Sequence, residues 1–240
     1  MKKQDKLPVS ALILAGGKGK RAGGNKLFLS LDGAFLVEPL IEKMSFIFDE
    51  VLLCAAHGES EAVHNAFQSL IKFYSVKITE DRSPERGPIE GLYTGLKAMV
   101  NKWGFLLGCD MPTPQEAVIR YMWSRTSGKS EEYKITAARL DGHLMPLHAF
   151  YHRDCASCVH SSIEQAECER DAAEDESELS RKKQRSGCNS KLNLKSFYDR
   201  TKVNIINENE LSTIPGWRRS FAGYNTGKEL ESLFSYKELG

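Results

Sequence analysis

Short apolar runs without polar alternation mark the first half of the chain. They are VSALILA at residues 9–15, VLLCAA at 51–56 and FLLG at 105–108. Such runs are typical of strands that are buried on both faces of a parallel sheet. Between and after them, apolar residues recur at the spacing of amphipathic helices. The predicted helices span residues 35–48, 59–73 and 89–101.

The alternation of strands and helices predicts an α/β fold. Because βαβ units place parallel strands in one sheet and helices on both of its faces, we expect three α/β/α layers around a Rossmann-like, mostly parallel sheet. Ligands of such sheets bind at the carboxyl ends of the strands. The residues that follow the apolar runs are therefore candidates for a binding site.

The second half of the chain is less regular. KITAARL and HLMPLHAFYH flank the turn pair Asp141-Gly142, which predicts a β-hairpin or a mixed-sheet excursion. KVNII at residues 202–206 is strand-like, and residues 226–237 have a helical pattern. Residues 164–190 form a charged insertion, in which an acidic block precedes a basic one. We expect a solvated helix or a mobile segment there, because it holds few large apolar residues and its acids offset its bases.

Length and composition fit one globular domain. The 240 residues are 41% hydrophobic with a formal net charge of +1, so no global field favours nucleic acid or a membrane surface. Six cysteines at irregular spacing favour a reduced compartment over a disulfide scaffold. Asp5 interrupts the basic start, and the apolar run behind it is short for a signal peptide. We expect a cytoplasmic protein without nucleic-acid or membrane partners.

The stretch LILAGGKGKRAGGNK, residues 12–26, follows the first predicted strand and contains five glycines. Its cations are Lys18, Lys20, Arg21 and Lys26. Backbone N–H groups of a glycine-rich turn can approach an anion closely, so phosphate binding is the leading hypothesis. A P-loop does not match because Asn25 separates Gly24 from Lys26, and no acidic residue closes the run at 51–56 as a dinucleotide site requires. The alternative is a glycine-rich connector with exposed lysines.

Two carboxylates follow predicted strands. Asp110 comes directly after FLLGC, where it is placed to hold Mg²⁺ together with substrate phosphates or, alternatively, to cap a helix that begins near Pro114. Asp81 follows the strand-like VKITE. A second tight turn comes next, formed by Gly87, Pro88 and Gly91. With the glycine loop, these residues converge on one nucleotide-sized crevice.

Four segments, taken in order, resemble the motifs of the molybdenum cofactor guanylyltransferase family. They are LAGGKGKRAGGNK, TEDRSPERGPIEGL, GCDMP and SFAGYNTGKEL. The resemblance implies a single domain over residues 1–240 with a sheet of the nucleotide-diphospho-sugar transferase type. Its nucleotide-binding half would span residues 8–125 and its acceptor-binding half residues 130–240.

The same resemblance implies the reaction. GMP would pass from GTP to the phosphate of molybdopterin, or of the molybdenum cofactor, with release of pyrophosphate. The metal ion would be Mg²⁺ or Mn²⁺, and molybdoenzyme chaperones would be further partners. The alternatives are a cytidylyltransferase or sugar-phosphate nucleotidyltransferase of the same fold, and a catalytically silent GTP-binding relative.

Carried over position by position, the resemblance also assigns roles to residues. Nucleotide binding falls on Leu14, Ala15, Gly16, Gly17, Lys26, Asp81, Gly87, Pro88, Gly91 and Asp110. Catalysis falls on Arg21, Lys26 and Asp110, metal binding on Asp110, and acceptor binding on Asn225. The chain departs from the family pattern at Asn25, Cys54, Gly223 and Gly227. Cys54 stands where some members carry an asparagine that contacts the base.

Two further features have mainly structural interpretations. CASC at residues 155–158 has the spacing of half a zinc site with histidines nearby, but no second pair completes it, which favours ordinary thiols. Trp103 is predicted to lie in the core. Trp217 and the two arginines after it would flank the acceptor pocket or form a surface turn.

Overall fold

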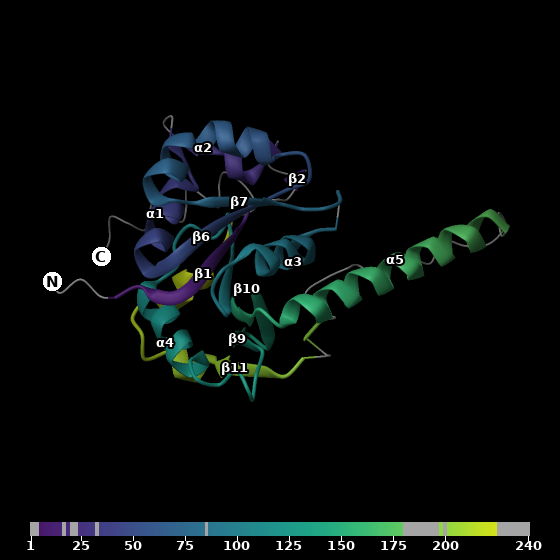
Figure 1. The fold of residues 1–240 in the computed structure, drawn as a ribbon. Helices are drawn as coiled ribbons and strands as arrows, with labels where there is room; N and C mark the ends of the chain where they lie inside the picture. Colours follow the sequence, from purple (N-terminus) through teal and green to yellow (C-terminus); the bar gives the residue numbers. More distant parts are fainter. Residues whose placement is uncertain are drawn as a thin grey trace.

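A seven-stranded mixed sheet forms the centre of the molecule in the computed structural model (Figure 1). The structure describes residues 5–15, 18–19, 24–31, 34–84, 86–179, 197–198 and 201–224. The strands, in order across the sheet, are β11 (Val203–Asn207), β9 (Ile135–Leu140), β10 (His143–His152), β8 (Trp103–Gly108), β1 (Leu7–Leu14), β6 (Phe48–Ala55) and β7 (Lys77–Glu80). β10 runs antiparallel to both of its neighbours, and the other pairs are parallel. The prediction of a mostly parallel sheet is confirmed.

Side chains of β1 alternate between two apolar cores, one on each face of the sheet. Ile13 belongs to the core that also holds residues of α1 (Glu38–Ile47), α2 (Ser60–Tyr74) and α4 (Glu116–Thr126). Leu12 belongs to the core shared with α3 (Pro88–Ala98) and α5 (Cys155–Leu179). Helices cover both faces of the sheet, and every residue of β1 except Pro8 is buried, so the three-layer arrangement is confirmed. Trp103 lies in the first of these cores, as predicted.

The predicted hairpin is formed by two neighbouring strands of the sheet. β9 and β10 pair in antiparallel register across Asp141 and Gly142, whose φ angles are 47° and 79°. Positive φ at both central residues is what a two-residue hairpin turn of type I′ requires, and Asp-Gly tolerates it well. The charged segment begins as a helix, because α5 continues to Leu179 and projects from the body of the molecule in Figure 1. The remainder of that segment and the predicted helix at 226–237 lie outside the described residues.

Element boundaries differ from the prediction where a local signal was overlooked. The helix expected from residue 35 begins at Glu38, because Pro39 favours a first-turn position and Phe35 pairs in the short ribbon of β4 (Ser30–Leu31) and β5 (Ala34–Phe35). The helix expected to reach residue 101 ends at Ala98.

Several short elements were not predicted at all. They are β2 (Lys18–Gly19), β3 (Gly24–Asn25), η1 (Lys26–Phe28), the ribbon of β4 and β5, α7 (Glu208–Leu211) and η2 (Trp217–Phe221). None of the helices in the described part of the chain has both the length and the apolarity to cross a membrane.

Candidate functional site

Lys26 and Asp110 meet beyond the carboxyl ends of the central strands. The Lys26 Nζ lies 2.9 Å from Asp110 Oδ2, although the two residues are 84 positions apart. Asp110 follows β8, and the Cys109 N–H donates to the carbonyl of Leu14 at the end of β1 over 3.1 Å. The end of β8 is thereby tied to the end of β1, directly beside the start of the glycine loop.

Glycine at position 108 makes room for the Asp110 carboxylate. A Cβ at this position would collide with Asp110 Oδ1, and it would lie 3.6 Å from Leu147 Cδ1 on β10. The Asp110 side chain is 27% exposed, so the carboxylate is reachable while Lys26 holds one of its oxygens. The alternative, that Asp110 caps α4, is not what the structure shows, because α4 has Gln115 at its N-cap position.

A backbone segment near the end of the described chain completes this cluster. Lys26 Nζ donates to the carbonyl oxygen of Tyr224 at 3.0 Å and lies 5.9 Å from the centre of its ring. The Tyr224 N–H in turn donates to the carbonyl of Asp110 at 3.0 Å. Burial, followed by electrostatic interaction with Cys109 and Asp110, raises the pKa of Tyr224. Its hydroxyl is buried without a hydrogen-bond partner among the described residues. Sequence reasoning missed Tyr224, because a backbone carbonyl leaves no residue-type signal.

Asp81 lies at the same edge, one residue after β7. Its N–H donates to the carbonyl of Ala55 over 3.0 Å, which extends the pairing of β6 and β7. Its Oδ1 is buried without a hydrogen-bond partner in the described chain. Burial, followed by the charges of Glu90 and Glu80, raises the pKa of Asp81 to about 7. A buried acceptor without a donor is costly, so the oxygen suits a ligand that brings an N–H or O–H group.

The second predicted turn brings α3 close to Asp81. Gly87 has a φ of 70° and immediately precedes the helix, and Pro88 occupies its first turn. A Cβ at Gly91 would lie 2.6 Å from Leu14 Cδ2 and 3.5 Å from Asp81 Oδ1. Glycine at position 91 therefore allows α3 to pack directly against β1 and Asp81.

Other positions of the predicted site fall into two groups. Leu14 and Ala15 are buried at the end of β1, where the Ala15 N–H donates to the carbonyl of Cys54 over 2.9 Å. Burial and the charge of Asp81 raise the pKa of the Cys54 thiol, which lies in the core beneath α3. The predicted residues outside the described part of the chain are Gly16, Gly17, Arg21 and Asn225.

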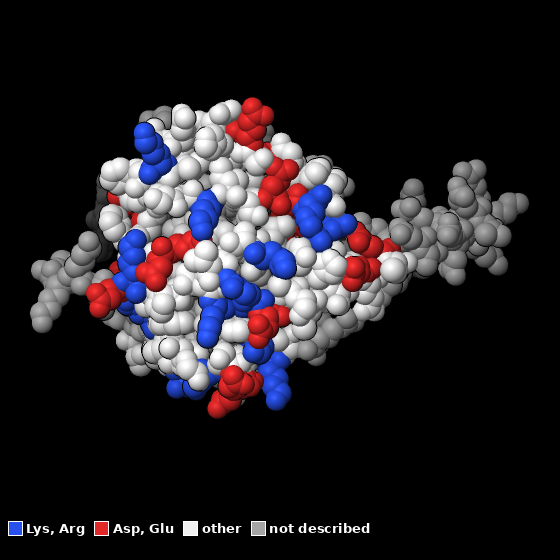
Figure 2. Space-filling view, viewed as in Figure 1, with Lys and Arg blue, Asp and Glu red and all other residues white. Residues whose placement is uncertain are grey.

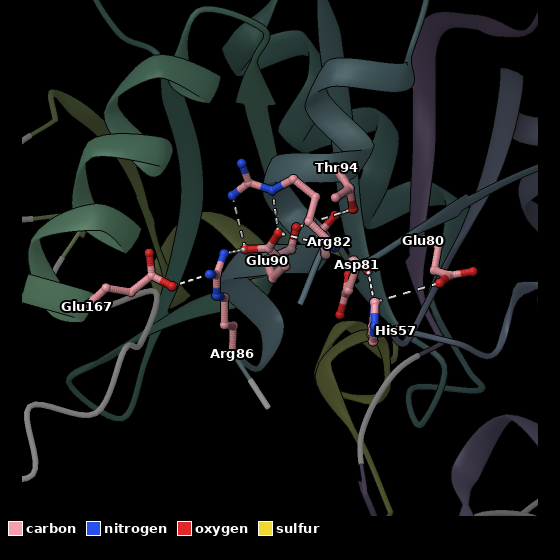
Figure 3. A network of polar contacts seen from close by, with 9 residues as sticks. His57, Glu80, Asp81, Arg82, Arg86, Glu90, Thr94 and Glu167 are labelled. Atoms are coloured by element: carbon pink, nitrogen blue, oxygen red, sulfur yellow. Dashed lines mark hydrogen bonds and ion pairs between the residues drawn. The ribbon is translucent and has the colours of Figure 1, made fainter. Parts of the chain in front are cut away.

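A network of ion pairs beside Asp81 was also missed from the sequence (Figure 3). The Glu90 carboxylate is fully buried and receives hydrogen bonds from Arg82 and Arg86. A signal was available in GPIEGL, where a charged residue interrupts the apolar face of a predicted helix.

The remaining sequence candidates lie away from this cluster or have ordinary partners. Cys155 is buried in the core under α5, whereas Cys158 is exposed. The Arg218 Cζ lies 4.8 Å from the centre of the Trp217 ring, and the guanidinium forms ion pairs with Asp141 and Glu208. These contacts are in keeping with a surface turn. On the face drawn in Figure 2, acidic and basic side chains are interspersed.

The donor set fits a cation that arrives with phosphates. Mg²⁺ in nucleotide sites is typically held by one or two carboxylates together with substrate oxygens and water. Asp110 supplies one partly exposed carboxylate. Within the described ranges, no group of three or more His, Cys, Asp or Glu is arranged to hold a metal ion. The described residues therefore suit a shared ion rather than a fully protein-coordinated one.

Comparisons of the sequence with known proteins identify relatives of this chain. A probable molybdenum cofactor guanylyltransferase from Natranaerobius thermophilus is 36% identical over 148 residues, which are 61% of this chain and 68% of that protein. One from Carboxydothermus hydrogenoformans is 27% identical over 233 residues, or 96% of this chain and 98% of the relative.

Solved structures share the fold. Molybdopterin-guanine dinucleotide biosynthesis protein A from Archaeoglobus fulgidus has a TM-score of 0.70 at 19% identity, covering 96% of this chain and 99% of that chain. The inositol-1-phosphate CTP transferase from T. maritima has a TM-score of 0.57 at 14% identity, covering 98% and 99%. The family model described as the MobA-like NTP transferase domain matches residues 11–181, more than half of the 240. The chain therefore belongs to the MobA-like NTP transferase domain family.

Proposed function

We propose that this protein transfers GMP from GTP to the phosphate of molybdopterin, or of the molybdenum cofactor, and releases pyrophosphate. The observation that carries the proposal is the contact of Lys26 with Asp110 at the carboxyl edge of the sheet, beside the end of β1. Family membership and relatives named molybdenum cofactor guanylyltransferase support the same reaction.

The site residues act mainly by positioning and by charge. Two phosphates that repel each other must be held in line, and negative charge on the transferred phosphoryl group must be stabilised. The Lys26 ammonium supplies positive charge at this point, and its contacts with Asp110 and Tyr224 fix its direction. We assign Arg21 and the glycines at 16 and 17 to the same phosphates on the strength of the family pattern. Asn225 is assigned to the acceptor on the same ground.

Asp110 is the proposed ligand of Mg²⁺, with Mn²⁺ as a substitute. When bound, the ion supplies charge neutralisation for the phosphates. The Asp110 carboxylate would hold the ion, and Lys26, which contacts the same carboxylate, would supply a second positive charge for the triphosphate. The unpartnered oxygen of Asp81 accepts a hydrogen bond from the nucleotide. We assign Gly87, Pro88 and Gly91 to the same nucleotide on the strength of the family pattern.

The reaction is placed in the cytoplasm, with molybdoenzyme chaperones as recipients of the product. The location is proposed from the irregular cysteine spacing and the short apolar run near the start of the sequence, and the chaperone partners from the family resemblance.

A pyrophosphate-release assay tests the proposal. Purified molybdopterin is supplied with each of the four nucleoside triphosphates and MgCl₂, and release is expected with GTP at least about tenfold faster than with CTP, ATP or UTP. Release with CTP in place of GTP would assign the protein to cytidylyl transfer. GTP binding without any release would identify a silent relative.

Asp81 makes the stability of the protein depend on pH. The pKa of the Asp81 carboxyl has its ordinary value of 3.8 in the unfolded chain and is about 7 in the folded protein, so the folded state holds the proton more tightly. Stability is therefore lost as the pH rises from about 4 to 7 and stays low above that range. We expect Asp81→Asn to raise Tm by roughly 5 °C at pH 8 and by clearly less at pH 5. Scanning calorimetry at both pH values measures the difference.

Asp154→Asn is the matched control for this experiment. Asp154 pairs with Lys134, and hydrogen bonding to that lysine lowers its pKa, the opposite direction from Asp81. The control should not gain stability at pH 8. A Tm gain for Asp81→Asn that is equal at both pH values would contradict a titrating Asp81.

A further inference from the structure

Glu90 is a buried carboxylate in the first turn of α3. Its side chain is fully buried, and its helix neighbours Ile89 and Leu92 lie in the apolar core shared with α5. Charged side chains are almost never buried completely unless they are paired. The contacts of Glu90 therefore determine what this residue does.

Glu90 is bound by both arginines of the connection between β7 and α3. Arg82 donates from Nε to Oε1 at 2.7 Å, from Nη2 to Oε2 at 3.4 Å and from its backbone N–H to Oε1 at 3.3 Å. Arg86 donates from Nη1 to Oε2 at 3.3 Å. Figure 3 shows the carboxylate between the two guanidinium groups. One side chain thus fixes both ends of this connection.

Each of the two arginines also contacts a side chain that lies outside the β7–α3 connection. The Arg82 guanidinium lies 4.1 Å from the centre of the Tyr93 ring, farther along α3. Arg86 forms an ion pair with Glu167 on α5. The network therefore joins the connection to two helices that pack on the same face of the sheet.

We propose that Glu90 is a positioning residue for nucleotide binding, which holds the β7–α3 connection so that Asp81 and Gly87 face the nucleotide. This inference rests on the proposed function. Asp81 lies immediately before Arg82 in the sequence, and Gly87 lies immediately after Arg86. Replacing a buried ion pair by apolar residues is often neutral or stabilising, so stability alone gives little reason for this arrangement. The need to fix the geometry of the connection beside the nucleotide site gives a better reason for burying these charges.

Glu90 also contributes to the charge around Asp81. After burial, the groups that act on the Asp81 carboxyl are Glu90 on α3, Glu80 at the end of β7, and His57 and Glu59 in the connection from β6 to α2. His57 lowers the pKa of Asp81, and the three glutamates raise it. Removing the charge of Glu90 while leaving Arg82 and Arg86 in place lowers the pKa of Asp81, so that Asp81 is ionised at lower pH.

Binding of a fluorescent N-methylanthraniloyl derivative of GTP with MgCl₂, titrated from pH 5.5 to 8.5, tests the inference. In wild type, binding should strengthen as Asp81 ionises near pH 7. We expect Glu90→Gln to weaken binding at pH 8 by about tenfold. The midpoint of its pH dependence should move down by about one pH unit.

Glu50→Gln is the matched control. Glu50 is a buried carboxylate near the start of β6, so it lies toward the amino ends of the parallel strands rather than their carboxyl ends. Lys77 Nζ lies 2.6 Å from its Oε1, and the Val100 N–H donates to its Oε2 over 2.9 Å. This variant should lose Tm but keep the wild-type affinity and pH midpoint. If Glu90→Gln loses Tm as Glu50→Gln does and keeps both binding parameters, Glu90 is merely structural and the inference is wrong.

A second variant covers the case in which Glu90→Gln does not fold. Arg82→Lys keeps the positive charge but cannot form the forked contact with Glu90. It should weaken binding of the GTP derivative about threefold to tenfold, and unchanged affinity would overturn the inference.

The outcomes separate this inference from the proposed function. If no nucleoside triphosphate supports pyrophosphate release, the proposed function is wrong. The affinities of wild type, Glu90→Gln and Glu50→Gln for the GTP derivative would still test the role of Glu90. Failure of the wild-type protein to bind the GTP derivative would contradict both.

Discussion

The Asp110→Asn variant is expected to fold normally and to lose pyrophosphate release by roughly 1000-fold or more. Asparagine has nearly the same shape, and its amide oxygen can still accept the hydrogen bond that Lys26 Nζ donates to Oδ2 over 2.9 Å. The change removes the negative charge that a divalent ion requires at this edge. Turnover with GTP, molybdopterin and varied MgCl₂ measures the loss, and circular dichroism monitors folding.

Asp154→Asn is the control for Asp110→Asn. Asp154 also accepts a hydrogen bond from a lysine, with Lys134 Nζ 2.8 Å from its Oδ2. It follows the end of β10, which pairs with the start of β8, whereas Asp110 follows the end of β8. Its replacement should change turnover less than twofold. Full magnesium-dependent activity of Asp110→Asn would remove Asp110 from the mechanism.

The second large effect is expected for Lys26→Met. Methionine keeps much of the length of the side chain but removes the ammonium that contacts Asp110 and the carbonyl of Tyr224. We expect kcat/KM for GTP to fall by roughly 100-fold to 1000-fold, the range seen when one charge-stabilising donor is removed. Steady-state kinetics with varied GTP measures the loss.

Magnesium dependence separates the roles of the two residues. Lys26→Met keeps the Asp110 carboxylate and loses a competing cation, so MgCl₂ should still strengthen its binding of GTP, at equal or lower concentration than in wild type. Asp110→Asn should lose that strengthening. Lys134→Met is the matched control for lysine removal and should keep wild-type kinetics. Wild-type kcat/KM in Lys26→Met would contradict the assigned role.

Much of the fold could be predicted because burial leaves a local pattern. The apolar run at residues 9–15 corresponds to β1, with the strand beginning at Leu7, and Asp141-Gly142 marks the hairpin of β9 and β10. The start of α1 differs from the prediction because the periodicity of apolar residues continues through Phe35, whereas Pro39 favours the first turn and the helix begins at Glu38. Patterns of this kind fix the element type better than its first residue.

The candidate site could be predicted where a side chain of distinctive chemistry follows a strand or lies in a glycine-rich turn. Asp81 and Asp110 satisfy that condition, and topology brings the ends of their strands to one edge. Tyr224 acts through its backbone carbonyl, which every residue type possesses, so its contact with Lys26 could not be foreseen. The partners of Glu90 depend on how α3 packs against the rest of the chain, which the spacing of residues does not specify.

The hydrogen bond between Lys26 and the Tyr224 carbonyl joins residues 198 positions apart. During synthesis on a ribosome, the strands that precede Tyr224 emerge first and are able to pair before this closing contact exists, since contacts of long sequence separation form late. The segment that contains Tyr224 is synthesised after all the strands of the seven-stranded sheet, so its contact with Lys26 can form only once those strands have been made.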